Sequence, residues 1–333
     1  MLRKARRHLR ACLVAVLPFG LPACVAPCDY GGGDTVAMVV RDGLPIVPVE
    51  VNGRRVPFVL DTGASRTTVF SESVAALGLP VDRLRSSSGL GIAGQSRERN
   101  ALLARMRVGE HDLRNLTVPV ATRSMPHRTG AVGLLGADLL GIGEVELDVS
   151  ARRLTLHDGR RCRVAAVPWV GEYDTIPVTL VAGGLVVVPA EVNGMAVRAL
   201  FDTGAMISAL RRSMASAIGV TEEVLAGLPT ATAHGIGTAG VELRLLRGVT
   251  VRVGAERIAG ASVGLVDLPS SLPFEMILGQ DYIGSRRFWL SYAERRLYVQ
   301  RTGGRGVGGA APTSAAARGI TAGPAAEPAP AGR

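Results

Sequence analysis

The sequence is poor in the residues from which metal sites are built. Its 333 residues include four Cys and five His, and neither Cys-x-x-Cys nor His-Glu-x-x-His occurs. The histidines stand singly along the chain, and single histidines are more often surface or core residues than ligands. The sequence therefore predicts no metal site and no cofactor, and it gives no support to a zinc hydrolase.

Aromatic residues and lysine are scarce as well. Phe, Trp and Tyr make up 4% of the chain, and Lys4 is the only lysine, so almost every basic residue is an arginine. Basic runs interleaved with aromatic residues, which are typical of nucleic-acid-binding surfaces, are missing. The formal charge of +10 suggests an anionic partner, but the sequence argues against nucleic acid.

The apolar run at the N-terminus is too short to cross a bilayer, which takes about 20 residues. Ala11–Ala23 has thirteen uncharged residues and follows five basic ones. This order predicts a secretory signal peptide over residues 1–23. The end of the run, Leu21-Pro22-Ala23-Cys24, resembles a lipobox, in which Cys24 would be lipidated, although Pro22 is uncommon there.

A plain secretory signal, cleaved near Ala23 or Ala26, is the alternative. Either way we expect an exported protein, periplasmic or held as a lipoprotein facing the periplasm. A lipid on Cys24 would be its only contact with the membrane.

Most of the positive charge lies outside the expected globular body. Residues 1–23 carry five positive charges, and the Ala-, Pro- and Gly-rich segment 301–333, predicted to be a disordered tail, carries four arginines and one acid. Residues 24–300 retain 29 basic and 27 acidic side chains, a balance of +2. Cys28 and Cys162 could form a disulfide in an oxidising compartment, and the sequence leaves this pairing open.

An internal repeat is the decisive feature of the sequence. The segment Val47–Ala64 returns as Val188–Ala205 without a gap, and both copies end in Asp-Thr-Gly-Ala. Four shorter matches follow in the same order: Gly89–Gly94 with Gly235–Gly240, Arg107–Gly109 with Arg252–Gly254, Leu134–Asp138 with Ile277–Asp281, and Arg152–Leu154 with Arg295–Leu297.

Two long copies predict two similar lobes, because solenoids need three or more short repeats. We expect lobes over residues 35–160 and 175–300, a tether over 24–34, and a linker over 161–174.

Each copy has the pattern of an all-β unit with one short helix. Asn52-Gly53 and Asn193-Gly194 lie between apolar segments, and Asn-Gly supplies the positive φ angles of a type I′ hairpin turn. Short helices are predicted over Ser71–Gly78 and Ser213–Gly219, each with an N-cap serine and a terminal glycine.

The candidate chemistry lies in Asp61 and Asp202, each of which follows an apolar strand. A carboxylate in such a place is costly unless it is paired, bonded or functional. If the lobes pack about a pseudo-twofold axis, the two carboxylates meet, share one proton and titrate as a pair. Such a pair can activate a water with one carboxylate and protonate a carbonyl with the other.

Two Asp-Thr-Gly-Ala segments after apolar residues, each followed by an apolar-apolar-Gly segment, resemble the retropepsin-like aspartic proteases. The resemblance covers nearly all of 35–300 and implies two lobes of this fold in one chain. It also implies a monomer that cleaves peptide or protein substrates with a water activated by Asp61 and Asp202.

The resemblance further implies support and substrate-binding residues. Thr62 and Thr203 would cross-bond the two loops, with Gly63 and Gly204 beside them, and Gly136 and Gly279 would pack over those loops. The tips of two flexible flaps would be formed by glycines of the second matched segment, Gly89, Gly91, Gly94, Gly235, Gly237 and Gly240. The copies differ after the motif, Ser65 against Met206, so the lobes are not interchangeable.

Three other patterns have simpler explanations. Both flap segments fit Gly-x-Gly-x-x-Gly, but they lie in strand-rich stretches, whereas a dinucleotide site needs a strand before and a helix after. Gly260–Gly264 fits a Gly-x-Ser-x-Gly elbow, yet no His follows Ser262. The recurring Asp138 and Asp281 are expected to cap a helix or turn.

Three hypotheses for the function remain. The first is an exported aspartic endopeptidase. The second is a catalytically silent peptide-binding module of the same fold, against which the intact motifs in both copies argue. The third, a purely structural envelope protein, is disfavoured because buried acid pairs without a task destabilise a fold.

Overall fold

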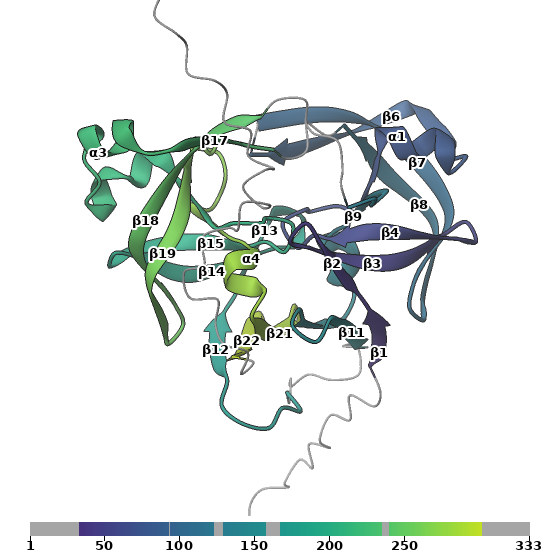
Figure 1. Cartoon of the computed structure of the whole chain (residues 1–333). Coiled ribbons are helices and arrows are strands. Elements are labelled where there is room, and N and C mark those ends of the chain that lie inside the picture. The colour runs from purple at the N-terminus through teal and green to yellow at the C-terminus, as the bar shows by residue number, and fades with distance from the viewer. Residues whose placement is uncertain (1–32, 93, 123–128, 158–166, 235–239, 302–333) are drawn as a thin grey trace, which may run out of the picture.

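Two lobes of matching topology, joined by a third sheet, make up the part of the chain that the computed structural model describes (Figure 1). These are residues 33–92, 94–122, 129–157, 167–234 and 240–301. The structure confirms the two lobes and the all-β class expected from the repeat.

The first lobe is an eight-stranded sheet with the order β2-β3-β4-β9-β5-β8-β7-β6. Its strands are β2 (Val39–Arg41), β3 (Leu44–Val51), β4 (Arg54–Leu60), β5 (Thr68–Phe70), β6 (Val81–Gly91), β7 (Gly94–Val108), β8 (His111–Ala121) and β9 (Gly133–Leu135). The parallel pair β4–β9 at its centre brings the end of β4 against a second buried strand.

The second lobe repeats this arrangement strand for strand, with the order β13-β14-β15-β20-β16-β19-β18-β17. Its strands are β13 (Thr179–Val181), β14 (Leu185–Val192), β15 (Met195–Phe201), β16 (Ala209–Arg211), β17 (Thr230–Ala233), β18 (Val241–Val253), β19 (Glu256–Val266) and β20 (Met276–Leu278). The equivalent order of all eight strands is the pseudo-twofold relation that the repeat predicts.

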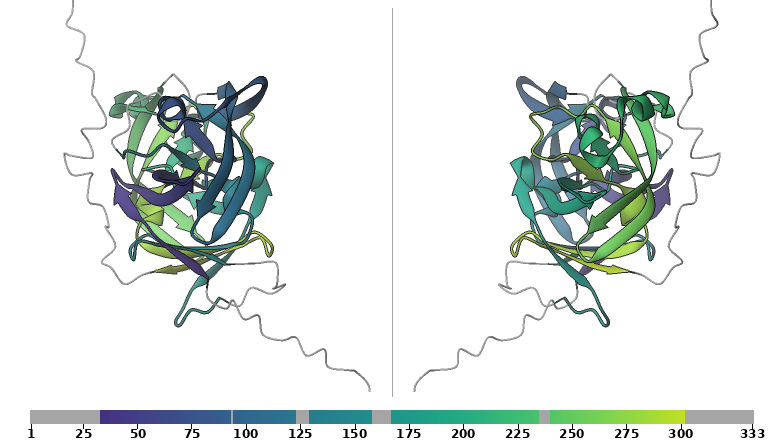
Figure 2. Two further views of the ribbon diagram at one scale, coloured as in Figure 1. Left: turned by 90° about the vertical axis from the view of Figure 1, so that its right-hand side faces the viewer. Right: turned by 90° about the vertical axis from the view of Figure 1, so that its left-hand side faces the viewer.

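A six-stranded sheet with the order β1-β11-β10-β21-β22-β12 takes three strands from each half of the chain. It lies below the lobes in Figure 1 and runs beneath both in the side views of Figure 2. Its strands are β1 (Asp34–Ala37), β10 (Glu144–Asp148), β11 (Arg153–His157), β12 (Asp174–Pro177), β21 (Arg286–Ser291) and β22 (Arg296–Arg301). The halves meet at the antiparallel pair β10–β21.

The hairpin predictions are confirmed at both Asn-Gly turns. Asn52 and Gly53 have φ angles of 48° and 83°, and Asn193 and Gly194 have 49° and 85°, as a type I′ turn requires. Each asparagine side chain also accepts a hydrogen bond of 2.9 Å, from the N–H of Arg105 in the first lobe and of Thr250 in the second. The turns thereby tie the hairpins to β7 and β18.

The helix predictions are correct only in part. The first helix is α1 (Ser71–Ala76), but Phe70 stands at its N-cap and Ser71 is already its first residue, so the predicted serine cap is wrong. Ser213–Gly219 forms two short 3-10 segments, Arg212–Met214 and Ser216–Ile218, instead of an α-helix. The remaining helical segments within the described ranges are α2 (Ala137–Leu140), α3 (Glu222–Gly227), α4 (Gln280–Ile283) and the 3-10 segment Ala182–Gly184.

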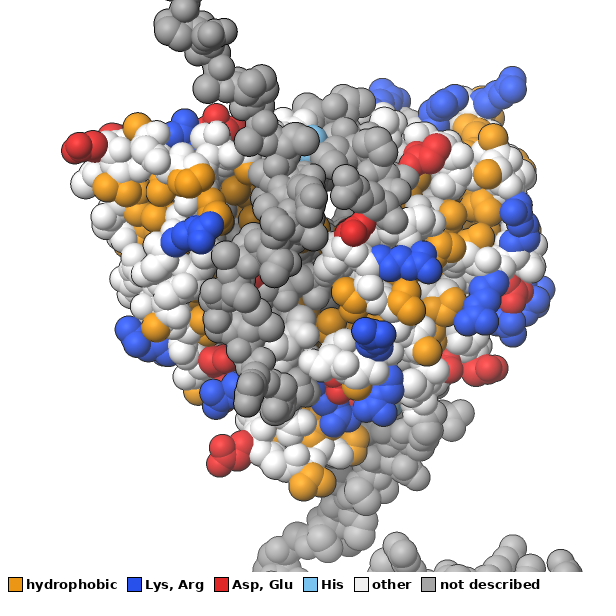
Figure 3. Space-filling view, viewed as in Figure 1, with side chains coloured by type: hydrophobic (Ala, Val, Ile, Leu, Met, Phe, Trp, Pro, Cys, Tyr) orange, Lys and Arg blue, Asp and Glu red, His pale blue; other side chains and the backbone are white. Residues whose placement is uncertain are grey.

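The main core continues from one lobe into the other through buried side chains, among them Phe58, Leu103, Phe201 and Phe288. On the face shown in Figure 3, arginine and acidic side chains are interspersed over both lobes. Within the described ranges, no helix is long and apolar enough to cross a membrane.

Candidate active site

Asp61 and Asp202 occupy equivalent places where a central strand of each lobe ends. Asp61 follows β4, and its N–H donates to the carbonyl of Leu135 on β9 over 3.0 Å. Asp202 follows β15 and donates in the same way to Leu278 on β20, also over 3.0 Å. Each aspartate is thus held by the parallel strand pair of its own lobe.

Backbone N–H groups of the following loops bind the carboxylates. Oδ1 of Asp61 accepts hydrogen bonds of 2.9 Å from the N–H groups of Gly63 and Ala64. Oδ1 of Asp202 accepts one of 2.8 Å from Gly204. Each carboxylate is therefore oriented by its own loop.

The two glycines are needed because the carboxylate of the opposite lobe lies against them. A Cβ atom on Gly63 would lie 2.3 Å from Cγ of Asp202, and one on Gly204 would lie 2.5 Å from Cγ of Asp61. Atoms cannot approach so closely, so any side chain here would push the carboxylates apart. The structure brings Asp61 and Asp202 together across the two lobes.

Two buried threonines lock the loops to each other. Oγ1 of Thr62 donates to the carbonyl of Phe201 over 2.7 Å and accepts from the N–H of Thr203 over 3.1 Å. Oγ1 of Thr203 donates to Leu60 over 2.7 Å and accepts from the N–H of Thr62 over 3.0 Å. These four reciprocal hydrogen bonds join the lobes directly beside the aspartates.

The surroundings of the pair favour a single shared proton. Burial raises the pKa of Asp61, while hydrogen bonds from Ala64 and Gly63 and the hydrogen bond with Asp202 act in the opposite direction. Burial raises the pKa of Asp202 well above its usual range, and the charge of Asp61 raises it further. The two carboxyls therefore share one proton and titrate as a pair, and the larger upward shift of the pKa at Asp202 favours Asp202 as the protonated member.

Gly136 and Gly279 lie against the loops that follow the aspartates. A Cβ atom on Gly136 would be 2.5 Å from the backbone of Arg66, and one on Gly279 would be 2.6 Å from the backbone of Ile207. Because these neighbours are backbone atoms, only glycine fits at either position.

Asp138 and Asp281 brace the same loops. Asp138 accepts hydrogen bonds from the N–H and hydroxyl of Thr67, over 2.7 and 2.8 Å, and Asp281 binds Ser208 in the same way, over 2.9 and 2.7 Å. Each also accepts from the N–H of the residue after it. They stand in the first turns of α2 and α4, but the N-caps are Gly136 and Gly279, so the capping expectation is correct only in part.

The first predicted flap is a long hairpin of β6 and β7, in which Gly91 pairs with Gly94. Gly89 also lies in β6, opposite Ser96. The side chain of Ile92, at the tip, packs on an apolar cluster of the second lobe that includes Ala205 and Ile207. The tip of the first flap therefore reaches across to the second lobe, beside its aspartate loop.

The second flap is described only at its base, where Ala233 of β17 pairs with Val241 of β18 and Gly240 precedes that strand. Several other predicted features lie outside the described residues, namely Gly235, Gly237, Cys24, Cys28, Cys162, the signal segment 1–23 and the tail 302–333.

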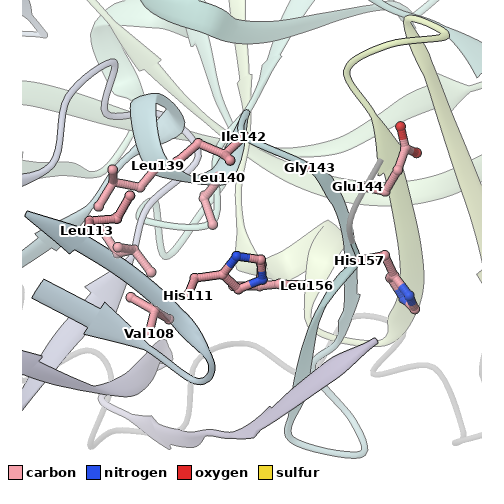
Figure 4. A pocket seen from close by; sticks show the side chains of 11 residues that line it. Val108, His111, Leu113, Leu139, Leu140, Ile142, Gly143, Glu144, Leu156 and His157 are labelled. Carbon is pink, nitrogen blue, oxygen red and sulfur yellow. The ribbon is translucent and has the colours of Figure 1, made fainter. Parts of the chain in front are cut away.

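Two cavities of the described structure lie away from the aspartates. The small one in Figure 4, about 20 Å³, is lined by Leu139, His111, Glu144 and His157 among others, and holds no more than about one water. A wider hollow of about 350 Å³ is lined by residues such as Glu50 and Arg107. Within the described ranges, no group of three or more His, Cys, Asp or Glu side chains could hold a metal.

The dinucleotide-binding and nucleophile-elbow motifs do not lie between the strands and helices that such sites require. Gly89–Gly94 lies at a hairpin tip, with strands on both sides. Ser262 lies inside β19, and the segment after that strand is not helical. Among the residues that the structure describes, Gly89–Gly94 therefore forms no dinucleotide loop and Ser262 no nucleophile elbow.

Some residues of the site were not predicted from the sequence. Thr67 and Ser208 are hydroxyl residues at equivalent places of the repeat, which is a signal that could have paired them with Asp138 and Asp281. Gln280, whose Nε2 donates to the carbonyl of Thr203 over 2.7 Å, has Ala137 as its counterpart, so the repeat gave no hint of it.

Comparison with known protein families shows to which family the chain belongs. A family model described as aspartyl protease matches residues 47–139 and 188–282, one segment in each lobe, and together these exceed half of the chain. The chain belongs to the aspartyl protease family. The resemblance drawn from the two Asp-Thr-Gly segments is thus confirmed, and each matched segment contains one aspartate of the pair.

A solved structure supports the two-lobed aspartic proteinase fold. The aspartic proteinase from Irpex lacteus superposes with a TM-score of 0.51 at 12% identity, over 82% of this chain and 98% of that one. At this identity the similarity concerns the fold alone. No curated protein matches the chain significantly.

Proposed function

We propose that this aspartyl protease is an endopeptidase that hydrolyses peptide bonds with a water molecule activated by Asp61 and Asp202. The observation that carries the proposal is the contact between the two carboxyls, in which burial raises both pKa values and the charge of Asp61 raises that of Asp202 further. An ionised carboxylate and a protonated one, side by side, are the general base and general acid that amide hydrolysis needs.

The geometry suggests how the proton moves. The ionised Asp61 takes a proton from the water as its oxygen attacks the peptide carbonyl carbon. Asp202 gives its proton to the carbonyl oxygen, which forms a neutral tetrahedral intermediate. Asp61 then returns its proton to the leaving nitrogen while Asp202 recovers one from the hydroxyl, so the dyad ends as it began. The N–H groups of Gly63, Ala64 and Gly204 keep the carboxylates oriented throughout.

Three further expectations belong to the proposal. The basic and apolar segment 1–23 supports export, and the sequence around Cys24 supports a lipid anchor facing the periplasm. The presence of both aspartates in one chain supports a monomer, because no second copy is needed to complete the pair. The proposed substrates are peptides or proteins.

The test is cleavage of a peptide library by purified residues 24–333. We expect Asp61→Asn and Asp202→Asn to lower kcat/KM by about 100-fold or more, since each removes the acid or the base of the dyad. The matched control is Asp112→Asn, an exposed carboxyl paired with Arg105, which should cleave normally. Cleavage that survived both dyad substitutions would overturn the assignment, and tight binding without cleavage would favour a silent peptide-binding module.

A further inference from the structure

The walls on the two sides of the dyad differ in chemistry although the lobes share one fold. In the first lobe, Arg66 donates to the hydroxyl of Ser87 over 2.6 Å and to the carbonyl of Thr117 over 3.2 Å. Ser87 donates in turn to Asn100 over 2.7 Å, and both of these side chains are buried. This wall is a connected polar network.

Glu98 adds an acid to the same wall. It pairs with Ser87 in the β6–β7 ladder and accepts a hydrogen bond of 3.2 Å from Ser96. Burial raises the pKa of Glu98, and the nearby charge of Arg66 acts in the opposite direction. The first-lobe wall therefore contains both a carboxyl group, on Glu98, and a guanidinium group, on Arg66.

The equivalent positions of the second lobe are all apolar. Five residues after its aspartate, Ile207 stands where the first lobe has Arg66. The ladder pair Ser87–Glu98 has its counterpart in Ala231–Leu243. Asn100, opposite Pro119, has its counterpart in Leu245, opposite Gly264. All four replacements belong to the apolar cluster on which Ile92 packs, namely Ile207, Ala231, Leu243 and Leu245.

Both walls lie between an aspartate loop and a flap. Arg66 is in the loop after Asp61, and its hydrogen bond to Ser87 reaches strand β6 of the first flap. Ile207 is in the loop after Asp202. The cluster to which Ile207 belongs also contacts Ile92 at the tip of the first flap. We therefore expect a peptide lying across the dyad to meet Arg66 on one side and Ile207 on the other.

The two walls select different side chains on physical grounds. An aliphatic side chain against Arg66 would desolvate the guanidinium N–H groups that do not bond to Ser87 or Thr117, which costs free energy, whereas a carboxylate or amide oxygen can accept from them. A charged side chain against Ile207 and Leu243 would be buried without a partner, whereas an aliphatic one gains from contact with the cluster.

We propose that the cleft is asymmetric, so that it takes an acidic or amide side chain on the Arg66 side of the scissile bond and an aliphatic one on the Ile207 side. This specificity rests on the proposed endopeptidase function, since it describes the same cleft. The determining residues are Arg66 and Ile207.

The experiment uses four peptides that carry Glu or Leu on either side of a central bond, in all combinations. Cleavage rate and binding to the intact protein, by fluorescence anisotropy, are both measured. One of the two mixed peptides should be preferred by about 10- to 100-fold over the Leu–Leu peptide, the range expected for a hydrogen bond to a charged group. If no peptide is cleaved, the endopeptidase proposal fails. The binding measurements then still test whether the cleft prefers different side chains on its two sides.

Substitutions then identify the walls. Arg66→Ile should remove the preference for Glu on its side, and Arg66→Gln, which retains hydrogen-bond donors for the network, should weaken the preference without loss of the fold. Ile207→Arg should introduce a preference for Glu on the other side. Arg114→Ile, at an exposed arginine paired with Asp112, is the matched control and should change nothing. Equal preferences on both sides in the wild type, or no change in Arg66→Ile, would overturn the proposal.

Discussion

At the scale of the residue, the absence of two side chains decides whether the carboxylates can meet. Gly63 and Gly204 each face the carboxyl group of the other lobe, and a Cβ atom at either place would come within 2.5 Å of it. The chain therefore needs glycine on both sides of the dyad axis. Small displacements matter here, because a shift of about 1 Å in a catalytic group costs about 100-fold in rate.

Gly63→Ala and Gly204→Ala should each lower kcat/KM by at least about 100-fold, because the new methyl group forces the dyad apart. Peptide cleavage measures the effect, and circular dichroism checks that the fold remains. Gly227→Ala is the control, since a Cβ atom there meets nothing within 4 Å and its φ angle suits any residue. Near wild-type activity in both dyad-side variants would contradict the steric argument.

The shared proton also makes stability depend on pH. The folded-state pKa of Asp202 lies above the ordinary value of 3.8, so protonation favours the folded state. This contribution is complete below about pH 3.8 and is lost as the pH rises through the folded-state pKa. Asp202→Asn keeps a donor toward Asp61 without the ionisation, so its melting temperature relative to wild type should rise with pH.

Thermal unfolding at about pH 3.5 and about pH 7.5 measures this difference. The control has the opposite sign: the hydrogen bond and charge of Arg105 lower the pKa of Asp112, so Asp112→Asn should lose a little stability at neutral pH and less in acid. An Asp202→Asn variant that gained no stability between the two pH values would contradict a proton held on Asp202.

At the scale of the element, the two aspartate loops are bonded directly to each other although they lie far apart in the sequence. Thr62 and Thr203 make four buried hydrogen bonds between the loops, two of them with each other across 141 positions of the chain. Thr62→Val keeps the shape but leaves the carbonyl of Phe201 and the N–H of Thr203 without their partner. Each buried group left in this way costs about 1–3 kcal/mol.

Because each variant leaves two such groups, urea unfolding should show a loss of about 2–6 kcal/mol for Thr62→Val and for Thr203→Val. The double variant should lose less than the sum, because both changes remove the same reciprocal network. Thr35→Val is the control, since its hydroxyl contact with Thr155 is exposed. Additive losses would mean that the two hydroxyls stabilise the loops independently.

Elements set by local chemistry could be read from the sequence, and those set by distant partners could not. The Asn-Gly turns specify their hairpins within a few residues, and the repeat reveals the two aspartates and their glycines. The β10–β21 pair joins segments about 140 residues apart, and no turn signals it. Helix α3, which the sequence analysis did not predict, also has a local signal, since Thr221 caps it by accepting from the N–H of Val224.

At the scale of the whole molecule, the six-stranded sheet makes the two halves specific for each other. β10 places Glu144, Glu146 and Asp148 in the buried seam, while β21 opposes them with Ser291, Trp289 and Arg287. Glu146 accepts from Nε of Arg287 over 2.6 Å, and Glu144 accepts from Trp289 and Ser291, each over 2.8 Å. A first half paired with its own copy in this register would instead oppose acids with acids, which is destabilising.

The halves produced as separate chains, residues 24–160 and 161–333, should therefore assemble one to one. Size-exclusion chromatography with light scattering measures the mass, and peptide cleavage should appear only in the mixture, because each half supplies one aspartate. As a control, a mixture with Asp202→Asn in the second half should assemble equally well without cleaving. A stable, active homodimer of residues 24–160 would contradict the argument, because the acids of β10 would then tolerate each other within the seam.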